Sequence, residues 1–222
     1  MRGQSLKRIG LVSAVLGALE PAEACFRDLW PGTERLVLYD EYLYELHGRE
    51  QRLTDEMYER VRRLLTLSAD SGVDAILFAG SLWGDCVLSC RDDFDIPVLT
   101  AYESLIEQAL SASADSKLAL LATVAGTITS FQADFERACD GKVELESVYV
   151  DQAMDELAAG NRTRHDELIV QRVAELSHCD TILLAQFSMQ SVAPQLVQKT
   201  NKQILGSVST AVTKLRALVD AQ

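Results

Sequence analysis

The sequence predicts an α/β protein with two pseudo-symmetric Rossmann-like lobes, parallel sheets and a cleft between the lobes. Three observations support this fold class. Short apolar runs alternate with amphipathic helical patterns, which is typical of parallel strands covered by helices on both faces. The second half of the sequence repeats the first. The 222 residues, 48% of them hydrophobic, can also bury a sizeable core.

Eight apolar runs predict eight strands, four in each half. The runs in the first half are Arg8–Val12, Leu36–Tyr39, Ala75–Ala79 and Pro97–Leu99. The runs in the second half are Lys117–Ala122, Val143–Val150, Thr181–Ala185 and Gln203–Leu205. Two longer segments, Leu53–Ala69 and His165–Leu176, have apolar residues at helical spacing and charge elsewhere. This pattern predicts amphipathic helices that pack against the sheets.

The repeat is visible in one closely matched string. Asp74-Ala-Ile-Leu-Phe-Ala-Gly-Ser81 aligns with Asp180-Thr-Ile-Leu-Leu-Ala-Gln-Phe187 at an offset of 106 residues, and Pro97–Ser104 aligns with Gln203–Thr210 at the same offset. The first strands of the halves align at an offset of 109. Because so small a drift is not expected by chance, we predict two lobes of the same topology.

The repeat also predicts where a ligand binds. Ligands of open α/β sheets lie at the carboxyl ends of the strands, where loops meet helix N-termini. Four such loops should line the cleft between the lobes: Ser13–Gly17, Gly80–Gly84, Thr123–Thr127 and Gln186–Ser191. Their hydroxyl and backbone N–H groups suit a carboxylate, although the same residues are also ordinary helix N-caps.

Composition excludes several classes of partner. With 21 Lys and Arg against 33 Asp and Glu, the formal charge is −12, and no basic face for nucleic acid is expected. The apolar run Ile9–Leu19 is too short to span a membrane, so we expect no membrane partner and a cytoplasmic location. Five irregularly spaced cysteines and three histidines predict neither a disulfide framework nor a metal site. We expect no cofactor. The sequence is compatible with a homodimer but does not predict one.

The matched segments resemble the aspartate/glutamate/hydantoin racemase superfamily over nearly the whole chain. The resemblance includes Asp74–Gly84, Leu120-Leu-Ala-Thr-Val-Ala-Gly-Thr-Ile128 and Asp180–Met189. It implies a cofactor-independent enzyme for a small carboxylate, in which one strand-end cysteine removes the α-proton and the other returns one. It further implies that the chain crosses back at its end. We therefore expect lobe 1 at residues 1–111 plus 195–222 and lobe 2 at 112–194.

Both cysteine positions of the family are substituted here. The first is Gly80 and the second is Gln186. Glycine has no side chain, and the amide of glutamine does not titrate in a useful range. The Ala79-Gly80-Ser81-Leu82 loop resembles the arylmalonate decarboxylase branch, which also has glycine at the first position but keeps the second cysteine. The resemblance thus implies fold and ligand type more than reaction.

The candidate site residues follow from these loops. Cys86 is a candidate displaced base and Gln186 a candidate hydrogen-bonding residue, although free cysteines are usually buried apolar residues. The candidate substrate-binding residues are Ser13, Gly80, Ser81, Leu82, Thr123, Thr127, Phe187 and Ser188.

Three more residues have open roles. Asp85 could act as a base instead of Cys86. Trp83 could wall the pocket or pack between the lobes, and His47 could affect specificity or lie at the surface.

Two functions remain to be distinguished. One is an isomerase or decarboxylase with non-standard catalytic residues that acts on an amino acid or a malonate-like acid. The other is an inactive binding or regulatory homologue. A residue able to move a proton beside the carboxylate favours the enzyme, and a site lined only by Gly80, Ser81, Gln186 and apolar groups favours the binder.

Overall fold

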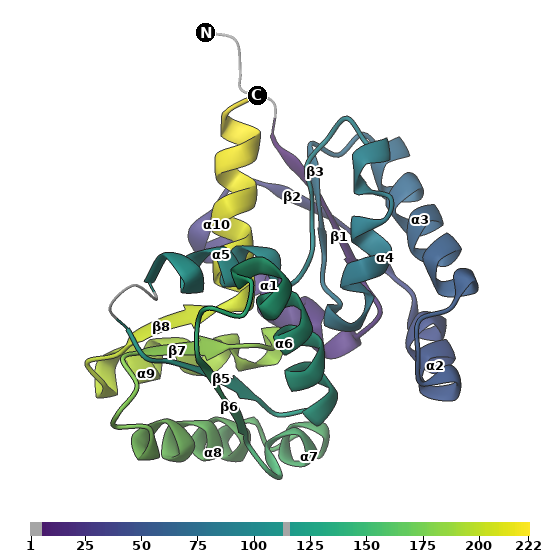
Figure 1. The fold of residues 1–222 in the computed structure, drawn as a ribbon. Coiled ribbons are helices and arrows are strands. Elements are labelled where there is room, and N and C mark those ends of the chain that lie inside the picture. Colours follow the sequence, from purple (N-terminus) through teal and green to yellow (C-terminus); the bar gives the residue numbers. More distant parts are fainter. Residues whose placement is uncertain (1–5, 113–115) are drawn as a thin grey trace, which may run out of the picture. The chain divides into compact units, whose positions relative to one another are not determined.

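The computed structural model describes residues 6–112 and 116–222 as two compact α/β units (Figure 1). Unit 1 contains residues 6–101 and Ala211–Gln222, and unit 2 contains Tyr102–Thr210. Each unit has its own four-stranded sheet, in which all the pairings between strands are parallel. The two predicted lobes and the predicted fold class are therefore confirmed.

Unit 1 has the strand order β2-β1-β3-β4. Its strands are β1 (Arg8–Ser13), β2 (Glu34–Tyr39), β3 (Ala75–Phe78) and β4 (Val98–Leu99). Its helices are α1 (Leu19–Leu29), α2 (Glu41–Glu50), α3 (Asp55–Asp70) and α4 (Gly84–Leu88), with short 3₁₀ turns η1 (Leu16–Ala18), η2 (Ser81–Trp83) and η3 (Arg91–Asp93). Helix α10 (Ser207–Asp220) belongs to this unit from Ala211 onward.

Unit 2 repeats this order as β6-β5-β7-β8. Its strands are β5 (Leu118–Ala122), β6 (Leu145–Tyr149), β7 (Thr181–Leu184) and β8 (Gln203–Gly206). Its helices are α5 (Glu103–Ala112), α6 (Ala125–Cys139), α7 (Ala153–Ala158), α8 (Arg162–Glu175) and α9 (Ala193–Lys199), with the 3₁₀ turn η5 (Phe187–Val192). The matched strands of the sequence repeat, β3 with β7 and β4 with β8, hold equivalent places in the two sheets.

Each unit has its own apolar core beside its sheet. In unit 1 the amphipathic helix α3 contributes Met57, Val61 and Leu65, all fully buried. In unit 2 helix α8 contributes Ile169 and Val173 in the same way. The inner strands β3 and β7 are buried along their whole length, which explains why they lack polar alternation. Among the described helices, none has the length and apolar character needed to span a membrane.

The boundaries between the units differ from those expected. We expected residues 195–222 to complete the first lobe, but β8 pairs with β7 from Thr181↔Gln203 to Leu184↔Gly206. Helix α5, expected in lobe 1, packs on β7 and β8 and belongs to unit 2. The physical reason is the repeat itself, because β8 occupies in the second sheet the place that β4 has in the first. Only Ala211–Gln222 returns to unit 1.

Candidate functional site

The loop after β3 has no room for a side chain at the first cysteine position of the family. Gly80 has an extended backbone and is followed directly by the turn η2. A β-carbon built on Gly80 would lie 2.8 Å from Cε1 of Phe78 and 2.8 Å from Cε3 of Trp83. Both distances are shorter than any normal carbon–carbon contact. Any side chain at position 80 therefore requires an aromatic ring to move.

Trp83 lies in an aromatic cluster inside unit 1. Its ring is fully buried, with centroids 6.4 Å from Phe78, 6.3 Å from Tyr44 and 6.2 Å from His47. The indole Nε1 has no hydrogen-bond partner within the described part of the chain. His47 is half-buried and meets the indole edge-on. The indole therefore packs against the loop after β3 and fills the space that a side chain at position 80 would need.

Cys86 lies one turn further along, in α4, and its environment does not suit a base. The side chain is fully buried among apolar residues of unit 1. Burial first, and then the nearby Asp85 and Cys90, raise the pKa of the Cys86 thiol to about 12. Because the thiolate is the basic form, almost none is present near neutral pH.

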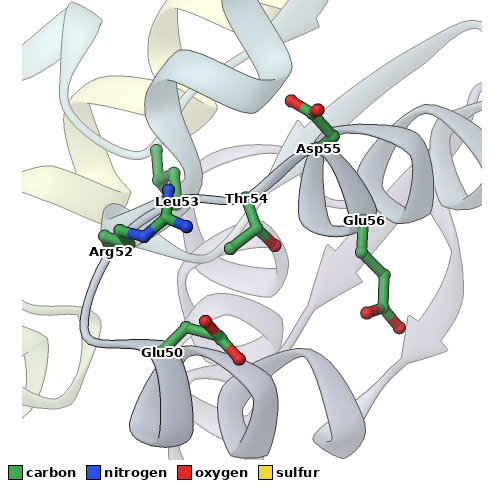
Figure 2. A pocket seen from close by; sticks show the side chains of 6 residues that line it. All are labelled: Glu50, Arg52, Leu53, Thr54, Asp55 and Glu56. Carbon is green, nitrogen blue, oxygen red and sulfur yellow. The ribbon is translucent and has the colours of Figure 1, made fainter.

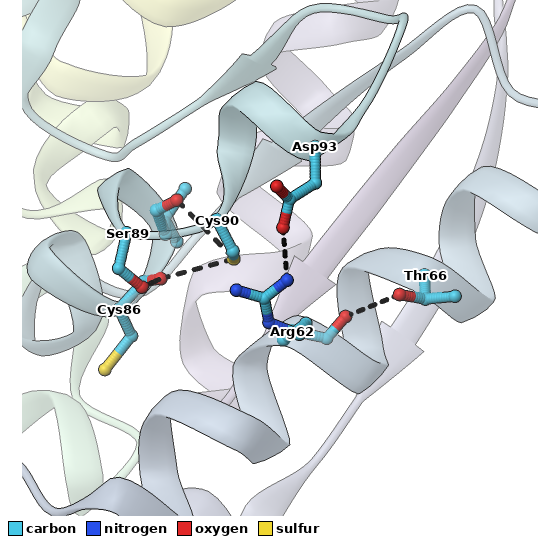
Figure 3. Close-up of polar contacts among 7 residues, drawn as sticks. Arg62, Thr66, Cys86, Ser89, Cys90 and Asp93 are labelled. Carbon is cyan, nitrogen blue, oxygen red and sulfur yellow. Dashed lines mark hydrogen bonds and ion pairs between the residues drawn. The ribbon is translucent and has the colours of Figure 1, made fainter.

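Figure 3 shows how the neighbouring thiol is engaged. Cys90 donates to the backbone carbonyl of Cys86, with a sulfur–oxygen distance of 3.4 Å, while the Cys86 sulfur points away from that contact. Arg62 of α3 pairs with Asp93 across the same region. These contacts bind α4 and the turn after it to α3, and they indicate a structural role for both cysteines.

Ser13, expected to contact a ligand, is instead used within the fold. Its hydroxyl lies 2.9 Å from the carbonyl oxygen of Ala79 and 3.0 Å from that of Val15, and it accepts the Val15 N–H at 3.1 Å. The side chain is buried, so it ties the ends of β1 and β3 together. Ser81 and Leu82 are half-buried at the start of η2.

In unit 2 the structure joins two of the predicted residues, Thr123 after β5 and Gln186 after β7. The Oε1 atom of Gln186 accepts the Thr123 backbone N–H at 2.6 Å and lies 3.1 Å from the Thr123 hydroxyl. Since a backbone N–H only donates, the accepting atom must be the amide oxygen, and this fixes the orientation of the amide. The Nε2 group of Gln186 therefore carries the two N–H donors of the amide, and the side chain is half-buried.

The other predicted residues of unit 2 are more enclosed. Thr127 is buried in the first turn of α6, where its N–H donates to the carbonyl of Val124 at 3.1 Å. Phe187 and Ser188 are buried in η5. The Ser188 hydroxyl has no hydrogen-bond partner among the residues that the structure describes.

A chain of polar contacts that positions η5 was not predicted from the sequence. His165 of α8 is fully buried, and its Nδ1 lies 2.6 Å from Oδ1 of Asp166. The same carboxylate oxygen accepts from the hydroxyl of Ser191 at 3.1 Å. In the sequence, only the adjacency of His165 and Asp166 indicates such a chain of contacts. Ser191 lies 25 residues after Asp166, so no local pattern links it to them.

A separate surface hollow of about 380 Å³ lies where α2 ends and α3 begins (Figure 2). It is lined by Glu50, Arg52, Leu53, Thr54, Asp55 and Glu56. The lining residues carry three carboxylates and one guanidinium, and this net negative charge disfavours a carboxylate ligand. None of its lining residues belongs to the four strand-end loops that the sequence predicts as the ligand site.

These features match a known class of protein. The sequence model of the Asp/Glu/Hydantoin racemase family matches residues 41–215, and the chain therefore belongs to that family. The matched region contains Gly80 and Gln186, and neither of these residues carries a thiol.

Solved structures share the fold at low sequence identity. Allantoin racemase from Klebsiella pneumoniae is 19% identical, with a TM-score of 0.72 over 97% of this chain and 88% of that chain. Glutamate racemase isoform RacE1 from Bacillus anthracis is 13% identical, with a TM-score of 0.67 over 98% and 83%. Unliganded arylmalonate decarboxylase is also 13% identical, with a TM-score of 0.65 over 96% and 93%. A comparison with curated proteins gave no match.

Proposed function

We propose that this protein binds a small carboxylate at Gln186, whose amide is oriented by Thr123, and does not carry out two-cysteine racemisation. The observation that carries the proposal is the contact between these two residues. The N–H and hydroxyl of Thr123 converge on the amide oxygen of Gln186. This contact fixes which end of the amide carries the N–H donors, and such donors suit an oxygen of a carboxylate.

The Gln186 amide also supplies hydrogen-bond donors for a carboxylate. With its oxygen directed to Thr123, its Nε2 group presents two N–H donors that a ligand oxygen can accept. Thr123 also comes just before α6, so the positive end of that helix favours an anion nearby. In unit 1, Ser81 is the corresponding candidate because it follows the equivalent strand β3.

We expect no two-thiol racemisation because of two features of unit 1, position 80 and the thiol of Cys86. Racemisation by two thiols needs a proton acceptor on one face of the α-carbon and a donor on the other. Position 80 offers no side-chain atom and no space for one. The pKa of Cys86, raised by burial to about 12, leaves that thiol protonated near pH 7.

Binding is tested by calorimetry with succinate, malonate and L-aspartate. We expect Gln186→Leu to weaken binding by about 1–3 kcal/mol, because a charge-assisted hydrogen bond is lost. Gln132→Leu is the matched control, since Gln132 is a half-buried glutamine of unit 2 that donates to the Ser147 hydroxyl at 2.9 Å. Equal affinities for the two variants, or no binding of any of these acids, would contradict the proposal.

The reaction is tested separately by proton exchange at the α-carbon in heavy water, followed by NMR. We expect no exchange with aspartate, glutamate or a simple hydantoin, because neither thiol position can accept a proton. Loss of carbon dioxide from a malonate is measured in parallel. Rapid exchange or decarboxylation would show that a base acts here, and Cys86→Ala would then be the first variant to examine.

A further inference from the structure

Three metal-ligating side chains meet at the end of unit 2 opposite Thr123 and Gln186. Glu146 is the second residue of β6, and His178 with Cys179 forms the turn that leads into β7. The cluster therefore lies at the amino ends of these parallel strands, whereas the proposed carboxylate site lies at the carboxyl ends. The sequence spacing did not predict it, because Glu146 lies 32 residues before His178.

The ligand atoms of the cluster already face one another. Nε2 of His178 is 2.6 Å from Oε2 of Glu146, and Sγ of Cys179 is 3.6 Å from that same oxygen. The nitrogen, sulfur and oxygen atoms all lie within 4.8 Å of one another. Ligands of one tetrahedral ion are roughly 3–4 Å apart, given bonds of about 2.0 Å to nitrogen and oxygen and about 2.3 Å to sulfur. An outward movement of the exposed Glu146 carboxylate lengthens its 2.6 Å contact with His178 into that range.

The turn that carries two of these ligands is held in place. Lys202 donates from Nζ to the carbonyl of Leu176 at 2.7 Å and also to the carbonyl of Cys179. The Cys179 N–H donates to the Leu176 carbonyl at 3.1 Å. These bonds fix the backbone at Cys179, so the thiol needs no rearrangement of the turn to meet an ion.

We propose that Glu146, His178 and Cys179 bind one Zn²⁺, with water in the remaining coordination position. A thiolate, an imidazole and a carboxylate form a ligand set that suits zinc, while calcium and magnesium require oxygen ligands throughout. His178 and Glu146 are exposed, so the ion has a path from solvent.

Binding at this place links β6 to the turn before β7. These strands are separated by β5 in the sheet, so the three ligands come together only in the folded unit. An ion that binds the folded state and not the unfolded chain stabilises the fold in proportion to the logarithm of its concentration. The consequence is a zinc-dependent thermal stability that is independent of the carboxylate site.

The test uses the full-length protein after treatment with a chelator. We expect calorimetry to show one Zn²⁺ per chain, added Co²⁺ to produce a thiolate-to-cobalt absorption band, and Mg²⁺ and Ca²⁺ to produce no heat. Cys179→Ser should remove the cobalt band. His178→Ala, at an exposed position that the fold tolerates, should weaken zinc binding at least about tenfold.

Cys139→Ser is the matched control, because Cys139 is a half-buried cysteine of unit 2 outside the cluster. It should keep both the cobalt band and the zinc affinity. No zinc binding by the unmodified protein would overturn the proposal, and so would a zinc affinity that His178→Ala leaves unchanged. A cobalt band that survives Cys179→Ser would overturn it as well.

Discussion

At the scale of single residues, Gly80 and Trp83 form one steric unit. The space that a β-carbon at position 80 needs is taken by the Trp83 indole and the Phe78 ring. The glycine at this position is thus matched by a large aromatic side chain three residues later. Restoring a cysteine at position 80 alone does not restore a family site, because the indole stands where the new side chain must go.

We expect Gly80→Cys to lower the free energy of unfolding by about 1–3 kcal/mol, the usual cost of overpacking a core. Gly17→Cys is the control, because Gly17 lies in the loop after β1, where an added β-carbon would meet nothing within 4 Å. That variant should change the free energy of unfolding by less than about 0.5 kcal/mol. Urea denaturation of both variants gives the comparison, and equal stabilities would show that the indole yields without cost.

The coupling is measured directly by a double-mutant cycle with Trp83→Leu. The smaller side chain leaves room beside position 80, so the double variant should be more stable than the sum of the single changes by about 0.5–3 kcal/mol. Additive changes in the free energy of unfolding would mean that Phe78, and not Trp83, restricts the position.

At the scale of elements, helix α10 carries the end of the chain from unit 2 to unit 1. Its buried apolar residues recur at helical spacing, and they are Val208, Ala211, Val212, Leu215 and Val219. Near its end, the guanidinium of Arg216 donates to the carbonyl of Leu29, the last residue of α1, at 3.0 Å. The apolar stripe, and not the polar contact at the surface, accounts for the burial of this helix.

Two leucines of α10 allow this to be tested within one helix. Leu215→Ala removes a fully buried side chain and should lower the free energy of unfolding by about 2–5 kcal/mol. Leu218→Ala changes a side chain that is 37% exposed and should cost less than about 1 kcal/mol. Thermal and urea unfolding measure both, and similar losses would show that the stripe does not anchor the helix.

At the scale of the whole molecule, the buried thiols should make the free energy of unfolding fall as the pH rises into the alkaline range. Burial raises the pKa values of Cys25 and Cys86 from 9.0 to about 12. Between these values the unfolded chain has lost the thiol protons, while the folded protein keeps them. The folded state binds more protons in this range, so its stability falls as the pH rises through it.

We expect the melting temperature of the protein to fall above about pH 9. Each thiol should lower the free energy of unfolding by up to about 1.4 kcal/mol per pH unit in this range. In the Cys25→Ala/Cys86→Ala variant, which has lower stability at pH 7, the fall should be shallower. Cys139→Ala, at a half-buried position, is the control and should retain the full slope. Parallel pH profiles for all three proteins would contradict this account of the thiols.

The sequence by itself determined the fold of each unit. The apolar runs predicted all eight strands, and the string from Asp74 matched to the string from Asp180 predicted equivalent strands. These signals are local, because a buried parallel strand needs apolar residues at successive positions. The same string placed Gly80 and Gln186 at the family's cysteine positions without any structure.

Only the tertiary structure decided what surrounds those positions. It showed the indole packed against Gly80, the Gln186 amide bonded to Thr123 at a separation of 63 residues, and the Ser13 hydroxyl used within the fold. The hydroxyl of Ser13 and the N–H of Thr123 are thus already bonded within the protein. The physical reason is that these contacts join segments far apart in the chain, and their distances depend on sheet register and helix packing that no local pattern records.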